Sequence, residues 1–435
     1  MYLAIVGFLM VFAIVALLLK GKMSPIVVLI FIPAVAAVLA GFGVVEVGGF
    51  IKEGVGTTMN NAILFIFSVI FFGVMSDVGV FDIIVDFLVK RAGANVIAIT
   101  VVTAIIAVIA HLDGATATTV LITIPAMYPI YKRMNIRPHV LLCIVAAGMG
   151  VMNLLPWGGP TARTATVLGM EATDLWHILI PIQIFGVVTT IGLGVILGII
   201  EKKRGAGLKK GDLGIVESTP EEDAKKAALK RPKLLWINVL LTVGLIVTLI
   251  LDVVTSYVVF MIFLSAALII NFPSLKEQDA RIKAHAPSAL IISATMVAAG
   301  AMVGILSGTG MLEAMAAVLI GIIPSPLGRF IHIIFGIFAL PLGMMIGTDA
   351  YFYGIMPLVI EVGTQYGVTA LNTALTMIIG KNVGLMISPL VPATFLAIGL
   401  VDVELKDHIK FSFKWLFGVS VVTMVAGIIL GIIQL

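Results

Sequence analysis

The sequence predicts an all-α polytopic membrane protein built from two inverted-topology repeats. Three observations predict this class: a very apolar composition, long uncharged segments that recur in the same order in both halves, and an uneven distribution of basic residues. Each repeat is expected to contain five membrane spans, one of them discontinuous, and one re-entrant helical hairpin.

The composition excludes an ordinary soluble domain. Hydrophobic residues make up 60% of the 435 residues, charged residues only 11%, and the mean hydropathy is +1.19. The apolar segments are continuous rather than alternating, which predicts helices and not barrel strands. Lys20 and Lys22 follow the first apolar segment, so a retained span is expected there instead of a signal peptide. The single cysteine, Cys143, excludes an intrachain disulfide.

The first repeat is expected over residues 1–200. Its hairpin is placed at about 95–131, and its discontinuous span, at about 139–170, is interrupted by prolines and glycines. A charged segment over 201–234 then predicts a cytoplasmic linker. The uninterrupted spans of this repeat are expected at about 2–19, 24–43, 57–76 and 176–200.

The second repeat is expected over 235–435, with a hairpin at about 329–366 and a discontinuous span at about 368–401. Its uninterrupted spans are expected at about 235–251, 255–270, 286–305 and 411–434. Matching residues recur at a nearly constant offset of 231 or 232, which indicates an internal repeat. They are Gly73 with Gly304, Ser76 with Ser307, Gly79 with Gly310, Asp82 with Glu313, Thr116 with Thr348, Pro125 with Pro357, and Pro160 with Pro392.

The basic residues predict the orientation. If both legs of each hairpin leave and return on one side, 23 of the 27 lysines and arginines face the cytoplasm, as the positive-inside rule expects. Both termini would then lie outside a plasma membrane of the bacterial inner-membrane type, and the second repeat would be inverted. The net charge of +4 follows this topology and predicts no nucleic-acid partner. Alternatively, 95–111 and 117–131 are two ordinary crossings, which would leave the later orientation unchanged.

The two hairpin tips carry the polar residues expected to bind substrate. The first tip follows His111 and has one carboxylate, Asp113, beside hydroxyls, and the second has Asp349. New helices begin after each tip and after each break, and their free amide groups attract anions. The predicted substrate-binding residues are Gly114, Ala115, Thr116, Thr118, Gly158, Gly159, Pro160, Thr161, Arg163, Gly347, Thr348, Ser388, Pro392 and Thr394.

Ionisable groups at membrane depth are candidates for coupling transport to protons or cations. The candidates are Asp113, His111, Asp349, Lys381 and Asn382, and the two aspartates are also the candidate metal ligands. Each has a structural alternative. Arg163 and Lys381 could form ion pairs, the aspartates could cap helices, and His111 could be a hydrogen-bonded packing residue.

The segments Asp113-Gly114-Ala115-Thr116-Ala117-Thr118-Thr119 and Pro156-Trp157-Gly158-Gly159-Pro160-Thr161-Ala162-Arg163 resemble the citrate–metal symporter family, CitMHS, within the ion transporter superfamily. The resemblance implies a homodimer with scaffold and transport parts, and proton symport of citrate complexed with Mg²⁺ or Ca²⁺. No other cofactor is implied. The tips of the divalent anion/sodium symporters read Ser-Asn-Thr, whereas Gly114-Ala115-Thr116 and Ile346-Gly347-Thr348 keep only the threonine, which weakens any transfer of sodium sites.

The sequence can also be compared with functions other than citrate symport. A proton- or sodium-coupled transporter or antiporter for another organic acid or a cation would use the same fold. An intramembrane aspartyl hydrolase using Asp113 and Asp349 would need a Gly-x-Gly-Asp context that is missing. The sequence also lacks the HExxH, GxSxG and phosphate-loop motifs of zinc proteases, serine hydrolases and ATP-driven pumps. We therefore expect a secondary transporter, working by elevator-type alternating access, and not an enzyme.

Overall fold

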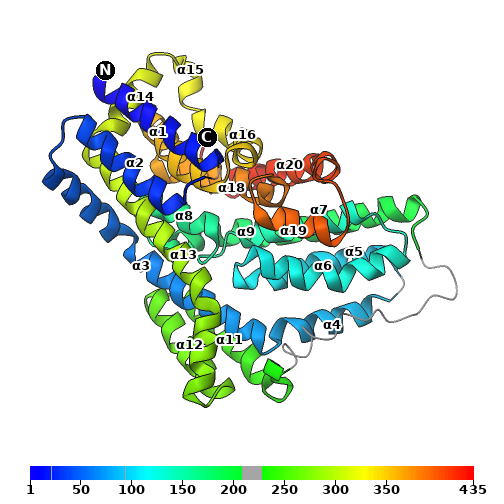
Figure 1. Ribbon diagram of the computed structural model, residues 1–435. Coiled ribbons are helices and arrows are strands. Elements are labelled where there is room, and N and C mark those ends of the chain that lie inside the picture. The colour runs from blue at the N-terminus through cyan, green and yellow to red at the C-terminus, as the bar shows by residue number, and fades with distance from the viewer. Residues whose placement is uncertain (21, 94, 208–227) are drawn as a thin grey trace.

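The structure is a computed structural model that describes residues 1–20, 22–93, 95–207 and 228–435 (Figure 1). Within these residues every regular element is a helix, and seven helices are long and apolar enough to cross a membrane. The predicted all-helical, membrane-spanning fold class is therefore confirmed. Most of the predicted linker, residues 208–227, lies outside the described residues.

The first half of the chain begins its helices where the sequence supplies start signals. Proline occupies the first turn of the second and seventh helices, and the Asn95 side chain accepts hydrogen bonds from the Ile97 and Ala98 amides at the start of the fifth. The elements are α1 (Tyr2–Lys20), α2 (Pro25–Leu39), α3 (Val44–Asp77), α4 (Val80–Ala92), α5 (Val96–Ala110), η1 (His111–Asp113), α6 (Thr116–Arg133), α7 (Pro138–Met152), α8 (Gly159–Leu168) and α9 (Ala172–Lys203).

The second half follows the same order. Its elements are η2 (Pro232–Leu234), α11 (Leu235–Leu251), α12 (Ser256–Asn271), α13 (Leu275–Gly308), α14 (Met311–Ile320), α15 (Ser325–Gly328), α16 (Ile331–Ile346), η3 (Ala350–Ile355), α17 (Met356–Gln365), α18 (Ala370–Lys381), η4 (Asn382–Ile387), α19 (Pro392–Leu400) and α20 (Leu405–Ile429). Two of the short elements are irregular, since η3 is a π-helical turn and η4 a 3₁₀ helix. Irregular turns of this kind are frequent at functional sites.

Helices α3 and α13 correspond to one another and pack side by side (Figure 1). Each has 34 residues, and each bound of α3 shifted by 231 gives the bound of α13. The Ser293 hydroxyl donates to the Ala62 carbonyl at 2.9 Å, and these two positions are also 231 apart. Equivalent residues of two repeats meet only near the axis that relates the repeats, so such an axis would pass close to this contact.

Glycines let these two backbones approach closely. A Cβ on Gly54 would lie 2.1 Å from the Gly300 carbonyl oxygen, and one on Gly304 would lie 2.2 Å from the Phe50 carbonyl oxygen. Gly300 and Gly304 are one helical turn apart, so they line a single face of α13. Small residues at this spacing are typical of tight helix crossings in membranes.

Both long helices extend beyond the expected spans. The sequence placed the spans at 57–76 and 286–305, but α3 begins at Val44 and α13 at Leu275. The reason is that charge limits the membrane-embedded part of a helix and not the helix itself. Lysine, arginine and glutamate are good helix formers, so the helix continues through residues such as Lys276 and Arg281.

Helices α5 to α9 and α16 to α20 form a second group beside the long helices α3 and α13 (Figure 1). In it, α5 packs against α7 and α9, and α16 packs against α18. Contacts also cross between the halves, because α6 packs against α19 and η3 against α8. The hairpin of each half therefore contacts the resumed helix of the other half. The re-entrant path of these hairpins and the inversion of the halves stay predictions.

Candidate functional site

The first hairpin tip is a tight turn between α5 and α6. The chain leaves α5 through η1, and Gly114 adopts φ +69°, a left-handed conformation that glycine tolerates best. The Asp113 carboxylate accepts a hydrogen bond from the Ala115 amide at 2.8 Å. Asp113 therefore stabilises the turn, although Ala115 and not Asp113 is the residue that precedes α6.

His111 lies in a buried network of hydrogen bonds. Its Nδ1 is 2.7 Å from the Thr119 hydroxyl, and its Nε2 is 3.1 Å from the Asn153 side-chain oxygen. The Thr161 hydroxyl donates to the Asn153 backbone carbonyl at 3.0 Å, which connects the network to the start of α8. Both ring nitrogens are thus engaged, an arrangement that favours the packing interpretation of His111 over that of a proton carrier.

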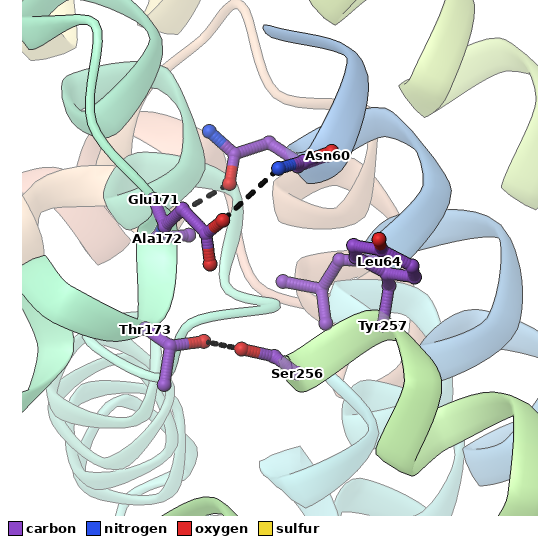
Figure 2. A pocket seen from close by; sticks show the side chains of 8 residues that line it. Asn60, Leu64, Glu171, Ala172, Thr173, Ser256 and Tyr257 are labelled. Carbon is purple, nitrogen blue, oxygen red and sulfur yellow. Dashed lines mark hydrogen bonds between the residues drawn. The ribbon is translucent and has the colours of Figure 1, made fainter. Parts of the chain in front are cut away.

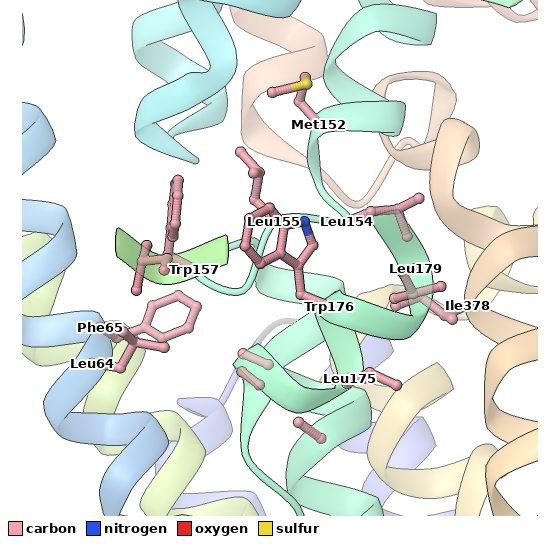
Figure 3. Packing of buried hydrophobic residues seen from close by; sticks show 14 of the residues in the cluster. Leu64, Phe65, Met152, Leu154, Leu155, Trp157, Leu175, Trp176, Leu179 and Ile378 are labelled. Atoms are coloured by element: carbon pink, nitrogen blue, oxygen red, sulfur yellow. The ribbon is translucent and has the colours of Figure 1, made fainter. Parts of the chain in front are cut away.

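Trp157 connects the first tip to the break between α7 and α8. Its indole nitrogen donates to the Leu112 carbonyl at 2.7 Å, and a Cβ on Gly114 would lie 3.0 Å from the Trp157 carbonyl oxygen. On its other side the indole packs against Phe72, with ring centroids 4.9 Å apart. Figure 3 shows Trp157 above the α3 side chains Leu64 and Phe65. The tip is therefore held between the break and α3.

The second tip contains an ion pair between the two halves of the chain. Arg163, on α8, donates through Nε to the Asp349 carboxylate at 2.7 Å, and each side chain is about one fifth exposed. A Cβ on Gly159 would lie 2.6 Å from the Arg163 guanidinium, so that group folds back closely over the start of α8. The ion-pair alternative for Arg163 thus describes the observed contact.

Lys381 reaches the same tip from the end of α18. Its ammonium donates to the Thr348 hydroxyl at 3.1 Å and lies 4.7 Å from the centre of the Phe352 ring. Only 2% of the residue is exposed, and within the described part of the chain no carboxylate lies within 4.0 Å of the ammonium. Gly343 leaves room for the lysine stem, because a Cβ there would lie 2.6 Å from its Cγ. Lys381 therefore carries a buried amine that makes no direct ion pair in the described part of the chain, although Asp349 acts on it electrostatically from farther away.

The second break contributes further polar groups. Ser388 donates to the Met344 carbonyl at 2.8 Å and accepts from the Leu390 amide at 3.2 Å. Pro392 occupies the first turn of α19. The Asn382 side-chain oxygen and the Thr394 hydroxyl are buried and have no hydrogen-bond partner among the described residues. Such groups are available to a ligand.

The structure places most of the predicted residues in two clusters. Asp113, Gly114, Ala115, Thr116 and Thr118 form the first tip and the first turn of α6, with Gly158, Gly159, Pro160 and Thr161 at the start of α8. Gly347, Thr348 and Asp349 form the second tip, which Arg163 and Lys381 reach through hydrogen bonds and which Ser388 approaches through its bond to Met344. Asn382 begins η4, whereas Pro392 and Thr394 lie in α19, which packs against α6 of the first hairpin. Among the described residues no hydrogen bond joins Asp113 to Asp349.

Sequence reasoning missed two members of the first cluster. Asn153 was outside the predicted set, although it is a polar residue at the end of an apolar run, directly before the proline break. Thr119 was recognised as part of the hydroxyl-rich tip, but not as the partner of His111. The signal that could have identified Asn153 is its position at the end of α7, where the last carbonyls of a helix lack partners within the helix.

A separate polar cluster joins the loop between α8 and α9 to α3 and α12. Figure 2 shows Asn60 bonded to Glu171, and Thr173 bonded to Ser256. The Asn61 side chain also accepts from the Ala172 amide at 2.9 Å. These bonds tie the helix group that bears the tips to the long helices, so we regard the cluster as a structural joint.

Broken helices with buried ionisable residues, in a chain with two corresponding halves, are typical of secondary transporters. The family model described as citrate transporter, CitMHS, matches residues 9–380. A citrate transporter of Bacillus subtilis (strain 168) is 38% identical over 434 residues, covering 99% of this chain and 100% of the relative. The chain therefore belongs to the CitMHS family, and it is a transporter and not an enzyme.

Two further comparisons agree with this assignment. The Mg(2+)/citrate complex secondary transporter of the same organism is 37% identical and covers 100% of this chain and 99% of the relative. The crystal structure of the Alcanivorax borkumensis YdaH transporter, described as having an unusual topology, matches with a TM-score of 0.59. That match covers 87% of this chain and 88% of the other at 17% identity, so it supports the fold alone.

Proposed function

We propose that this protein takes up citrate complexed with a divalent metal ion by proton symport. The proposal is carried by the placement of Arg163 and Lys381, two cationic groups from opposite halves of the chain, at the second hairpin tip. It is supported by the full-length relatives that are named for citrate and for its magnesium complex. The family resemblance further suggests a homodimer, and the charge pattern suggests a plasma-membrane location with both termini outside.

Citrate carboxylates would bind at the helix ends that surround the tips. The starts of α6, α8 and α19 direct backbone amides toward the breaks, and Gly158 and Gly159 allow close backbone approach. Lys381 would donate to one carboxylate. Arg163 is held by Asp349 and would exchange part of that pairing for the substrate.

The metal ion would enter as part of the cargo. Mg²⁺ and Ca²⁺ prefer oxygen ligands, and citrate itself supplies several of them. Asp349 already pairs with Arg163, so Asp113 is the better candidate for a protein ligand to the metal. The two aspartates would thus have distinct roles, with Asp349 pairing with Arg163 and Asp113 binding the metal.

A buried lysine that makes no direct ion pair suggests how protons couple to the anion. A charged ammonium in an apolar surrounding is costly unless an anion balances it. Binding of a citrate carboxylate next to Lys381 would therefore favour binding of a proton there, and the reverse holds by linkage. Among the candidate coupling residues, Lys381 fits this role better than His111, whose ring nitrogens are both engaged.

Charge sets the number of protons that uptake requires. Fully ionised citrate with one divalent metal carries a charge of −1, and the membrane potential opposes its entry by about 2.3 kcal/mol per 100 mV. One proton cancels this charge, and a second would let the potential drive uptake. We propose that at least two protons accompany each complex and that transport is electrogenic.

Alternating access would proceed by movement of the tip-bearing helices against the long ones. Helices α2, α3, α12 and α13 pack on one another and would form the scaffold. The two hairpins and the two broken spans would form the moving part, carrying the site across the membrane. The joint at Asn60 and Glu171 would then have to rearrange.

The experiment that tests the proposal is uptake of labelled citrate by proteoliposomes. Uptake is expected to need Mg²⁺ or Ca²⁺, to stop on addition of a chelator, and to rise with an acidic exterior and an interior-negative potential. Uptake that ignores both the pH gradient and the potential would refute proton symport. Competition by other organic acids, replacement of protons by sodium, or movement of a cation without citrate would favour the alternative transporters.

A further inference from the structure

A cavity of about 330 Å³ lies away from both hairpin tips, between the start of α7 and the first turns of α20. Four of its lining residues come from α20, at spacings that place them on one helix face, and two come from the start of α7. The lining residues are Arg137, His139, Asp407, Lys410, Phe411 and Lys414. Three of these six side chains are cationic and one is anionic, so the cavity favours an anion.

The positive charge of Arg137 is only partly balanced. Its Nε donates to the Glu201 carboxylate at 2.7 Å, but Arg204 donates to the same carboxylate at 3.0 Å. One buried carboxylate therefore serves two guanidinium groups. The Arg137 guanidinium also lies 5.2 Å from the centre of the Phe411 ring, which fixes its position at the edge of the cavity. Lys410 and Lys414 are exposed and have no ion pair in the described part of the chain.

The cavity lies at the level expected for lipid headgroups. The charge pattern places the residues just before α7 and α20 on the cytoplasmic side. The first turns of α20 then carry aromatic residues, and the Lys414 ammonium lies 5.6 Å from the centre of the Trp415 ring. Tryptophan beside lysine is typical of the boundary between the membrane core and the headgroups.

We propose that this cavity binds the phosphate group of an anionic phospholipid from the cytoplasmic leaflet. Lys410, Lys414 and Arg137 would surround the phosphate, and Phe411 would contact the glycerol backbone. Basic pockets between transmembrane helices on the cytoplasmic side suit such headgroups. The Asp407 carboxylate also lines the cavity and repels anions. It therefore disfavours a ligand whose negative charge would fill the whole cavity.

The test compares lipid binding by purified protein and by variants of α20. Phosphatidylglycerol is added to protein in a neutral detergent, and the thermal unfolding midpoint is followed against lipid concentration. The midpoint is expected to rise for the natural protein. In Lys410→Gln/Lys414→Gln the apparent dissociation constant is expected to increase about tenfold or more, since each basic residue near a membrane surface contributes about 1 kcal/mol. The matched control is Lys406→Gln, an exposed lysine of α20 that does not line the cavity.

Further variants and ligands, measured in the same way, identify what binds in the cavity. Lys410→Arg/Lys414→Arg should keep lipid binding, which separates loss of charge from loss of folding. An equal response to zwitterionic phosphatidylcholine would overturn the proposal. So would an equal response to inorganic phosphate or to citrate without lipid, since either would identify a site for soluble anions. Full binding by the double glutamine variant would also overturn it.

Discussion

Arg163 and Lys381 both reach the second hairpin tip, but only Arg163 forms a direct ion pair with Asp349. The Arg163–Asp349 pair is neutral as a unit, and it is about one fifth exposed. Lys381 is buried against aromatic rings and a threonine hydroxyl. We therefore expect an arriving anion to gain most from Lys381, because no carboxylate is in direct contact with its amine.

Replacing Lys381 with methionine should abolish transport without harming the fold. Removal of an unbalanced buried charge is expected to leave thermal stability unchanged or higher. Loss of the cation should cost about 2–5 kcal/mol of substrate binding, roughly 30-fold or more in affinity. Citrate–Mg²⁺ binding and proteoliposome uptake measure the effect, with the exposed Lys52→Met as the control. Uptake close to that of the natural protein would exclude Lys381 from the site.

The Arg163–Asp349 pair can be tested by a double-mutant cycle. Arg163→Gln and Asp349→Asn each leave one partly buried charge without its partner and should each lower stability by about 1–3 kcal/mol. The double variant should lose less than the sum, because neither charge remains. The free energy of unfolding in mixed micelles measures this coupling. Strict additivity would show that the contact contributes nothing to stability, as exposed ion pairs often do not.

At the scale of single elements, the crossing of α3 and α13 depends on glycine. Gly54→Ala would place a methyl group 2.1 Å from the Gly300 carbonyl oxygen, so the helices would have to separate. A loss of about 1–3 kcal/mol or more is expected from such overpacking. Gly56→Ala, on the same helix but in open space, should raise helix stability by up to about 1 kcal/mol. Similar unfolding free energies for the two variants would show that the crossing is loosely packed.

Element by element, the sequence predicted helix positions better than helix lengths. Apolar segments and proline breaks located the α7–α8 and α18–α19 interruptions, because proline cannot continue the backbone hydrogen bonds. Hydropathy could not reveal how far α3 and α13 extend into water. It also could not predict the π-helical turn η3, since residues 350–355 are apolar and carry no local signal for that geometry.

The sequence suggests which residues form the candidate site, which stays a prediction, but it does not reveal how they pair. Arg163 and Lys381 stood out as basic residues within apolar segments. Their partners are set by packing between the halves, since Arg163 and Asp349 are 186 positions apart in the chain. Asn153 was missed for a similar reason, because its contact with His111 requires the end of α7 to meet the first tip.

For the molecule as a whole, the repeat conserves the framework but not the chemistry. An offset of 232 places Gly343 opposite His111 and Met149 opposite Lys381. The space that the imidazole occupies in the first half is filled in the second half by the stem of Lys381. The same arrangement of helices thus presents a hydrogen-bonded network beside the Asp113 carboxylate at one tip and cationic groups at the other. Such asymmetry suits an anionic complex that also contains a metal.

Inversion of the two halves is a prediction about the whole molecule, and equivalent positions of α3 and α13 test it. Val45 and Lys276 are both exposed at the starts of these helices and are 231 positions apart. The only cysteine, the buried Cys143, is first replaced by alanine. Val45→Cys and Lys276→Cys are then introduced singly, and intact cells are treated with a membrane-impermeant maleimide. If the repeats are inverted, Val45→Cys reacts from outside, whereas Lys276→Cys reacts only after the cells are opened. Reaction of both from the same side would mean that the halves run parallel, and the hairpins would then enter from one face.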